Sequence, residues 1–159
     1  MNRLQKLPEY YNPSVYIVDD NEVVRDSYVT LMESCGLHVK AFESAEEFLN
    51  NIEKHSCGCV LTDFQMNGCN GLELLKTMKS AGYNLPAILV SGSLDPTTMV
   101  CARSEGAFAI LEKPYAVPTL WETVIKAILT DSQNRTSPDV APRLTTDQTQ
   151  RSHPGKGIR

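Results

Sequence analysis

Four short polar signals in this sequence each stand just past an apolar run of four or five residues. The signals are Asp19-Asp20 after 15–18, Asp63 after 59–62, Ser91 after 87–90, and Lys113 after 107–111. They supply three carboxylates, one hydroxyl and one ammonium, a set of groups that suits a divalent cation and a phosphoryl group. Short apolar runs are typical of buried strands in a parallel sheet, and the carboxyl ends of such strands share one edge. The sequence therefore predicts that these side chains meet in one crevice.

The carboxylates define a candidate metal site. Adjacent carboxylates such as those of Asp19 and Asp20 repel each other unless a positive charge lies nearby. Mg²⁺ (or Mn²⁺) bound through oxygen would supply that charge and keep some of its waters. Asp63 could be a third ligand or a nucleophile on phosphorus, and the backbone carbonyl of Gln65 could reach the same ion. Taken alone, the Asp-Asp pair would indicate only an exposed acidic turn.

The hydroxyl and the ammonium would act on the phosphoryl group itself. Ser91 could donate to one phosphoryl oxygen, although a serine here could also be a simple turn residue. Lys113 precedes Pro114, which favours an extended lysine backbone and would direct the ammonium into the crevice. A cis bond at this step is compatible with the sequence. We expect the ammonium to pair with Asp63 at rest; the alternative is an exposed loop lysine.

Strand-like and helix-like segments alternate through the part of the chain that must position these groups. The predicted strands are 15–18, 37–42, 59–62, 86–90 and 107–111. Five helices are predicted. They are 22–34, a helix that begins after Ser44, 72–82, 96–104 and 118–129. Asn21, Ser44 and Asp95 are predicted N-caps, and Ser44 with Glu47 has the spacing of a capping box. The alternation predicts a doubly wound α/β sandwich around a five-stranded parallel sheet.

The composition indicates one globular domain with a short segment on either side. The chain has 159 residues, of which 42% are hydrophobic and 21% charged, as expected for one globular domain at 13–130. We expect 1–12 to be a loose lead-in and 131–159, which lacks aromatic residues, to be a disordered tail. No secretion signal or bilayer-length apolar run is present, so we expect a cytoplasmic protein without a membrane partner. The net charge of −4 argues against nucleic-acid binding through this chain.

Five segments carry a family resemblance. They are VYIVDD at 15–20, LTDFQM at 61–66, NGLELL at 70–75, ILVSG at 88–92 and LEKPY at 111–115. In combination they resemble the response-regulator receiver domains of two-component signalling. The resemblance covers roughly 13–130 and is nearest to receivers of nitrogen-fixation-type regulators, which are fused to helix-turn-helix output domains. It implies a flavodoxin-like (βα)5 fold.

The resemblance also implies roles for the residues singled out above. Asp63 would be the phosphoacceptor, Asp19 and Asp20 the acidic Mg²⁺ pocket, Ser91 the switch hydroxyl and Lys113 the lysine typical of the family. The implied phosphodonor is a histidine kinase or a histidine phosphotransfer protein. The output would be a protein target, and activation could produce a homodimer. Such a protein is a signalling phosphoprotein rather than an enzyme, because it catalyses only its own phosphorylation and dephosphorylation.

The sequence departs from the family pattern at Asn67 and Ile110, and the second departure bears on function. Asn67 stands where the family usually has proline, and Ile110 stands at the switch aromatic position, three residues before the lysine. An aliphatic side chain cannot make the inward and outward rotation by which the family's aromatic ring signals phosphorylation. The open alternatives are a receiver-like scaffold that works without phosphorylation and the receiver portion of a longer transcriptional regulator.

Two other classes fit the sequence poorly. A haloacid-dehalogenase-type phosphotransferase needs a second acid two residues after the nucleophile, and Gln65 occupies that place. A flavin carrier of the same fold needs a phosphate-binding loop after the first strand, where Asp19 and Asp20 would repel the flavin phosphate.

Overall fold

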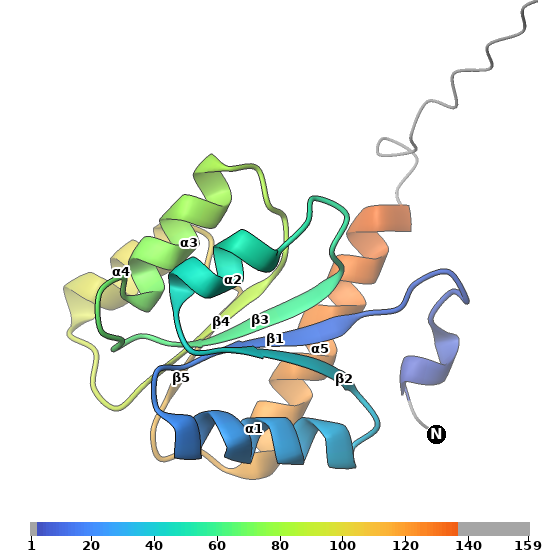
Figure 1. The fold of residues 1–159 in the computed structure, drawn as a ribbon, viewed down its shortest axis with the longest axis horizontal. Coiled ribbons are helices and arrows are strands. Elements are labelled where there is room, and N and C mark those ends of the chain that lie inside the picture. The colour runs from blue at the N-terminus through green and yellow to red at the C-terminus, as the bar shows by residue number, and fades with distance from the viewer. Residues whose placement is uncertain (1–2, 137–159) are drawn as a thin grey trace, which may run out of the picture.

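A five-stranded parallel sheet forms the centre of the molecule (Figure 1). The computed structural model describes residues 3–136. The strands are β1 (Ser14–Val18), β2 (His38–Phe42), β3 (Gly58–Asp63), β4 (Ala87–Ser91) and β5 (Ala109–Glu112). The helices are the 3-10 helix η1 (Arg3–Lys6), α1 (Glu22–Ser34), α2 (Ala45–Asn51), α3 (Gly71–Ser80), α4 (Pro96–Ser104) and α5 (Val117–Thr136). The strand order is β2-β1-β3-β4-β5, and all pairs are parallel.

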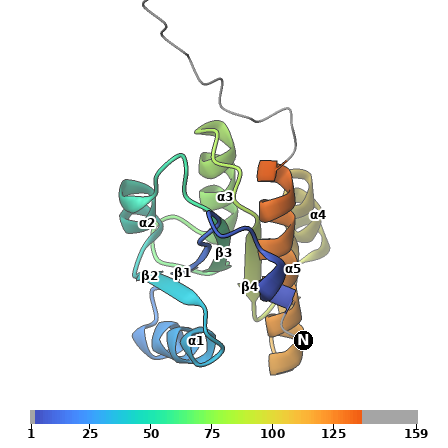
Figure 2. The same ribbon diagram turned by 90° about the vertical axis from the view of Figure 1, so that its right-hand side faces the viewer.

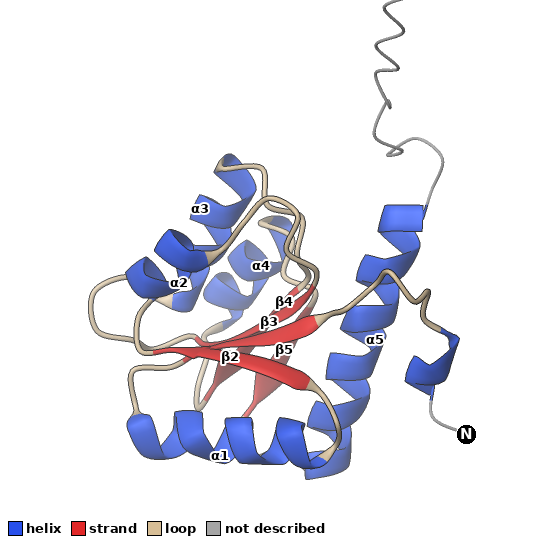
Figure 3. Ribbon diagram, turned by 45° about the vertical axis from the view of Figure 1, so that its right-hand side comes forward, coloured by secondary structure: helices blue, strands red, loops and turns tan. Residues whose placement is uncertain are grey.

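Helices cover both faces of the sheet, with α1 and α5 on one side and α2, α3 and α4 on the other (Figures 1, 2 and 3). Successive strand residues alternate between the two faces because side chains in a strand point to opposite sides. Val15 and Ile17 of β1 pack in the core under α1 and α5, whereas Tyr16 and Val18 pack in the core under α2 and α3. Burial on both faces explains why the strands read as continuous apolar runs.

The strand register brings the predicted site residues to the same edge. Val18 lies beside Thr62, Asp63 beside Val90, and Ser91 beside Glu112. Strand β2 lies on one side of β1, and β3, β4 and β5 follow on its other side. The direction in which strands are added to the sheet therefore reverses between β1 and β3. Crevices at such a reversal are the usual ligand sites of open α/β sheets.

Three predicted N-caps are present in the structure. The side chains of Asn21, Ser44 and Asp95 each accept a hydrogen bond from the backbone N–H three residues later. The second half of the predicted Ser44 box differs, because the Glu47 carboxylate accepts from the N–H of Glu43. The predicted strands agree with the observed ones to within two residues at either end.

Ordered structure extends past both predicted ends of the domain, with a short helix at Arg3–Lys6 and helix α5 running beyond residue 130. Helix α5 continues to Thr136, so a coil beginning at residue 131 is not observed. Asp131 is 2% exposed and accepts hydrogen bonds from Tyr11 Oη at 2.8 Å, Gly58 N at 2.9 Å and Arg135 Nε at 2.8 Å. The predicted loose lead-in therefore contains a short helix and a buried tyrosine tied to α5. Residues 1–2 and 137–159 of the predicted lead-in and tail lie outside the described residues.

Among residues 3–136, no helix combines the length and the apolar character needed to cross a bilayer.

Candidate functional site

The loop after β1 places two carboxylates in different surroundings. Asp19 is 1% exposed, and its Oδ1 accepts a hydrogen bond of 2.9 Å from Asn21 N. Its backbone carbonyl accepts one of 2.8 Å from Arg25 Nη1 on α1. Asp20 is exposed, and its Oδ2 accepts a hydrogen bond of 2.9 Å from Asn67 N. The pair thus connects the loop after β1 to the loop after β3.

Asp63 and Lys113 form an ion pair at the end of β3. The Asp63 side chain is 17% exposed, and its Oδ2 lies 3.3 Å from Lys113 Nζ. The other oxygen, Oδ1, accepts a hydrogen bond of 2.9 Å from Gln65 N. The backbone N–H of Lys113 donates to Ser91 O at 2.7 Å, and the bond to Pro114 is cis. The resting contact between the ammonium and Asp63 is therefore present, and both side chains remain partly exposed.

Ser91 lies at the same edge, but its hydroxyl serves a local turn. The residue is fully buried, and its Oγ donates to Ser93 O at 3.1 Å and accepts from Ser93 N at 3.3 Å. The structure thus brings Asp19, Asp63 and Lys113 together and places Ser91 on the adjacent strand in the arrangement of a turn serine.

Gly71 is a positioning residue that the sequence reasoning missed. A Cβ atom at this position would lie 2.7 Å from Asp63 O and 3.0 Å from Phe64 Cα. The backbone N–H of Gly71 donates to Phe64 O at 2.9 Å, so α3 begins directly against the end of β3. The preceding Asn70 forms a full capping box with Glu73. A partial signal was available in the Asn70-Gly71 step, because asparagine is a preferred N-cap and glycine suits positions where the backbone approaches a neighbour closely.

The donor set fits a hard divalent cation. Asp19 Oδ2 is buried without a hydrogen-bond partner among the described residues, which is rare for a carboxylate oxygen. Within residues 3–136, no three side chains of His, Cys, Asp or Glu close around a common point as a complete ligand cluster. Mg²⁺ commonly binds through one or two carboxylates and keeps several waters, so an incomplete protein shell suits it. Asp19, Asp20, Asp63 and the Gln65 carbonyl would hold the ion here.

The electrostatics of Asp19 lead to a stability prediction. Burial raises the pKa of Asp19 above 3.8, the Asn21 N–H opposes this, and the charge of Asp63 adds to the increase. Between 3.8 and the raised pKa the folded protein holds a proton that the unfolded chain has released, so stability falls as pH rises through this interval. We expect Asp19→Asn to increase the metal-free free energy of unfolding at pH 7 by about 1 kcal/mol.

Urea unfolding at pH 7 and at acidic pH measures this effect. The difference in unfolding free energy between Asp19→Asn and the wild type should become smaller at acidic pH, because the wild-type carboxyl is then neutral as well. Asp20→Asn is the matched control, because Asp20 is exposed and already accepts from Asn67 N. A lower stability for Asp19→Asn at pH 7 would contradict the account.

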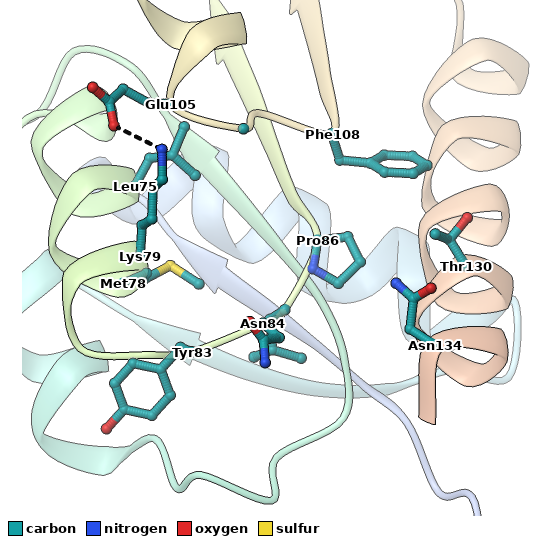
Figure 4. A pocket seen from close by; sticks show the side chains of 12 residues that line it. Leu75, Met78, Lys79, Tyr83, Asn84, Pro86, Glu105, Phe108, Thr130 and Asn134 are labelled. Atoms are coloured by element: carbon teal, nitrogen blue, oxygen red, sulfur yellow. Dashed lines mark ion pairs between the residues drawn. The ribbon is translucent and has the colours of Figure 1, made fainter. Parts of the chain in front are cut away.

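A hollow of about 320 Å³ lies at the opposite edge of the sheet. Figure 4 shows Lys79 of α3 paired with Glu105 after α4 across one side, and Phe108 and Asn134 on another. The Lys79–Glu105 ion pair spans 3.6 Å and is partly exposed. None of the predicted site residues lines this pocket, so the candidate site remains the carboxyl edge.

Comparisons with known proteins agree with this geometry. The family model of the response regulator receiver domain matches residues 15–125. The response regulator protein TodT of Pseudomonas putida is 33% identical over 131 residues, which cover 82% of this chain and 56% of TodT. The transcriptional regulatory protein FixJ of Bradyrhizobium diazoefficiens is 37% identical over 114 residues, which cover 72% of this chain and 56% of FixJ. The crystal structure of FixJ-N matches with a TM-score of 0.67 at 32% identity, covering 75% of this chain and 95% of that one.

The chain belongs to the response regulator receiver family. Within that family it is of the FixJ-like type, which confirms the resemblance seen in the motifs. The flavodoxin-like fold with a five-stranded parallel sheet is confirmed as well. A receiver is a signalling module of two-component systems, and its family implies a histidine kinase as partner. The chain spans a little over half the length of TodT and FixJ.

Proposed function

We propose that this receiver accepts a phosphoryl group on Asp63 from a phosphohistidine in a Mg²⁺-dependent reaction. The observation that carries the proposal is the Asp63 carboxylate, which is partly exposed at the sheet edge and 3.3 Å from the Lys113 ammonium. The buried Asp19 oxygen without a partner supports a cation at the same edge. The donor would be a histidine kinase or a histidine phosphotransfer protein.

In the phosphoryl transfer one bond to phosphorus forms and one breaks. An Asp63 oxygen forms the new bond to phosphorus while the phosphorus–nitrogen bond of the donor breaks. The electron pair of that bond remains on the donor imidazole, which takes up a proton. Bound Mg²⁺ would neutralise charge on the phosphoryl oxygens. Lys113 would exchange its contact with the Asp63 carboxylate for one with a phosphoryl oxygen, which keeps its ammonium paired throughout.

Ser91 connects the chemistry to the loop before α4. Its hydroxyl donates to Ser93 O at rest, so donation to a phosphoryl oxygen would require that bond to break. The carbonyl of Ser93 would then need a new partner, and the loop between β4 and α4 would rearrange. Ile110 is half-buried against the core under α2, α3 and α4, so this route uses backbone bonds rather than an aromatic ring. Phosphorylation would thereby shift a two-state equilibrium around α4, β5 and α5.

The output of this receiver is a protein contact or an attached domain. TodT and FixJ are a response regulator and a transcriptional regulator that extend beyond the matched region. The chain can therefore act as the receiver portion of such a regulator or through a separate target protein. A homodimer formed on phosphorylation is compatible with either arrangement. The acidic net charge supports output that does not pass through direct nucleic-acid binding by this chain.

Titration with beryllofluoride, an analogue of the phosphoryl group, tests the proposal. The wild-type protein should bind it only when Mg²⁺ is present, and the single tryptophan, Trp121 on α5, offers a fluorescence signal. Asp63→Asn should abolish this binding, while the exposed control Asp26→Asn should retain it. Absence of binding to the wild type, or equal binding to Asp63→Asn, would favour a scaffold that works without phosphorylation.

A further inference from the structure

Two tyrosine hydroxyls meet beside the candidate site. Tyr28 lies on the inner face of α1 and Tyr115 lies two residues after Lys113, and their Oη atoms are 2.5 Å apart. Tyr28 is 9% exposed, and Tyr115 is partly buried against the same core. Since the two residues are far apart in the sequence, this hydrogen bond joins α1 to the loop between β5 and α5.

The tyrosine pair lies within the field of the acidic groups. Burial raises the pKa of Tyr28, its hydrogen bond to Tyr115 raises it further, and the charges of Asp19 and Asp63 add to the increase. The Tyr28 hydroxyl therefore keeps its proton near neutral pH and can take part in the hydrogen bond to Tyr115. Arg25, three residues earlier on the same face of α1, donates to the carbonyl of Asp19. Helix α1 thus contacts both sides of the site.

The loop held by Tyr115 is the one that carries the lysine. Only Pro114 separates Lys113 from Tyr115. On its other side, Lys113 is fixed by the bond from its N–H to Ser91 O. Its side chain is 35% exposed, and the distance of 3.3 Å to Asp63 exceeds the 2.7–2.9 Å typical of a strong charged hydrogen bond. Contacts of the side chain alone hold the ammonium weakly, so its position depends on the loop.

We propose that Tyr28 and Tyr115 are a positioning pair that holds the Lys113 ammonium at the acceptor carboxylate and so increases the rate of phosphoryl transfer to Asp63. The inference rests on the proposed function, because that transfer is the reaction whose rate the pair controls. Neither hydroxyl is assigned a contact with the phosphoryl group. The pair acts through Lys113, and its removal should leave the metal ligands in place.

The test measures phosphorylation by acetyl phosphate at saturating Mg²⁺, in which acetate leaves as the Asp63–phosphorus bond forms. Tyr28→Phe and Tyr115→Phe should each lower the rate constant about fivefold. The dissociation constant for Mg²⁺ alone should stay within about twofold of wild type, because its ligands lie on other loops. Tyr83→Phe is the matched control, since it removes only a hydroxyl that donates to Ile52 O.

A double-mutant comparison separates positioning from general loosening of the fold. In a Lys113→Met background, Tyr115→Phe should cause no further loss of rate, because the group that it positions is gone. A fivefold loss in both backgrounds, an unchanged rate in the single variants, or a parallel loss of Mg²⁺ affinity would overturn the inference. If the wild type itself were not phosphorylated, the proposed function would fail and the positioning role would fail with it.

Discussion

Asp63→Asn is expected to lower phosphorylation of this receiver by at least about 100-fold. The amide has nearly the shape of the carboxylate but lacks the anionic oxygen that attacks phosphorus. It also removes the partner of the Lys113 ammonium, which lies 3.3 Å from Asp63 Oδ2. Transfer of labelled phosphate from a phosphorylated histidine kinase, or from acetyl phosphate, measures the effect.

The control for this prediction is Asp26→Asn on the exposed face of α1, which changes the net charge by the same amount. Asp26→Asn should be labelled as the wild type is. Circular dichroism of Asp63→Asn should match that of the wild type, because the side chain is not part of either hydrophobic core. Labelling of Asp63→Asn at the wild-type rate would contradict the assignment of the acceptor.

Asp131→Ala is expected to lower the free energy of unfolding by about 3 kcal/mol. The carboxylate accepts from Tyr11 Oη, Gly58 N and Arg135 Nε inside the fold. Alanine would leave a buried backbone N–H and a phenol without this acceptor, and each such loss is costly. It would also leave the guanidinium without its ionic partner. Urea unfolding followed by circular dichroism measures the change.

Tyr11→Phe is the graded comparison at the same cluster. It removes one donor and leaves the carboxylate with two, so we expect a loss of only about 1 kcal/mol. If Asp131→Ala were no more destabilising than Tyr11→Phe, the carboxylate would not be the centre of this cluster. Both variants lie at the end of the molecule away from Asp63, so phosphorylation at low temperature should be retained.

The fold and the acidic edge were predictable because their signals are local. Each strand is a short apolar run, and each polar signal follows its strand directly, so the edge on which Asp63 stands needed only the rule for parallel sheets. Caps such as Asn21 and Asp95 could be identified for the same reason, because the bonded groups are three residues apart.

Contacts between distant residues were not predictable from the pattern. The residues after Thr130 are polar and were expected to be coil, yet Asp131 is buried by Tyr11 and Gly58, which come from the first half of the chain. The contact between Tyr28 and Tyr115 depends likewise on how α1 and the loop after β5 are placed. A single sequence with ordinary periodicity contains no signal for either pairing.

The roles of single atoms at the site also required the structure. The sequence predicted carboxylates near one another, but only the structure shows that Asp19 Oδ2 has no hydrogen-bond partner within residues 3–136. The sequence allows Ser91 to be a switch hydroxyl or a turn serine, and at rest it makes the hydrogen bonds of a turn serine. Its bond to a phosphoryl oxygen remains a prediction for the phosphorylated state.

Locating the phosphoryl group tests the central claim most directly. An acyl phosphate is reduced by borohydride to an alcohol, so a phosphorylated aspartate becomes homoserine and can be identified by mass spectrometry. After reaction with acetyl phosphate and Mg²⁺, we predict homoserine at position 63 and none when the metal is chelated. Homoserine at another position, or a phosphoryl group found elsewhere with residue 63 unchanged, would contradict the assignment of this edge as the phosphoacceptor site.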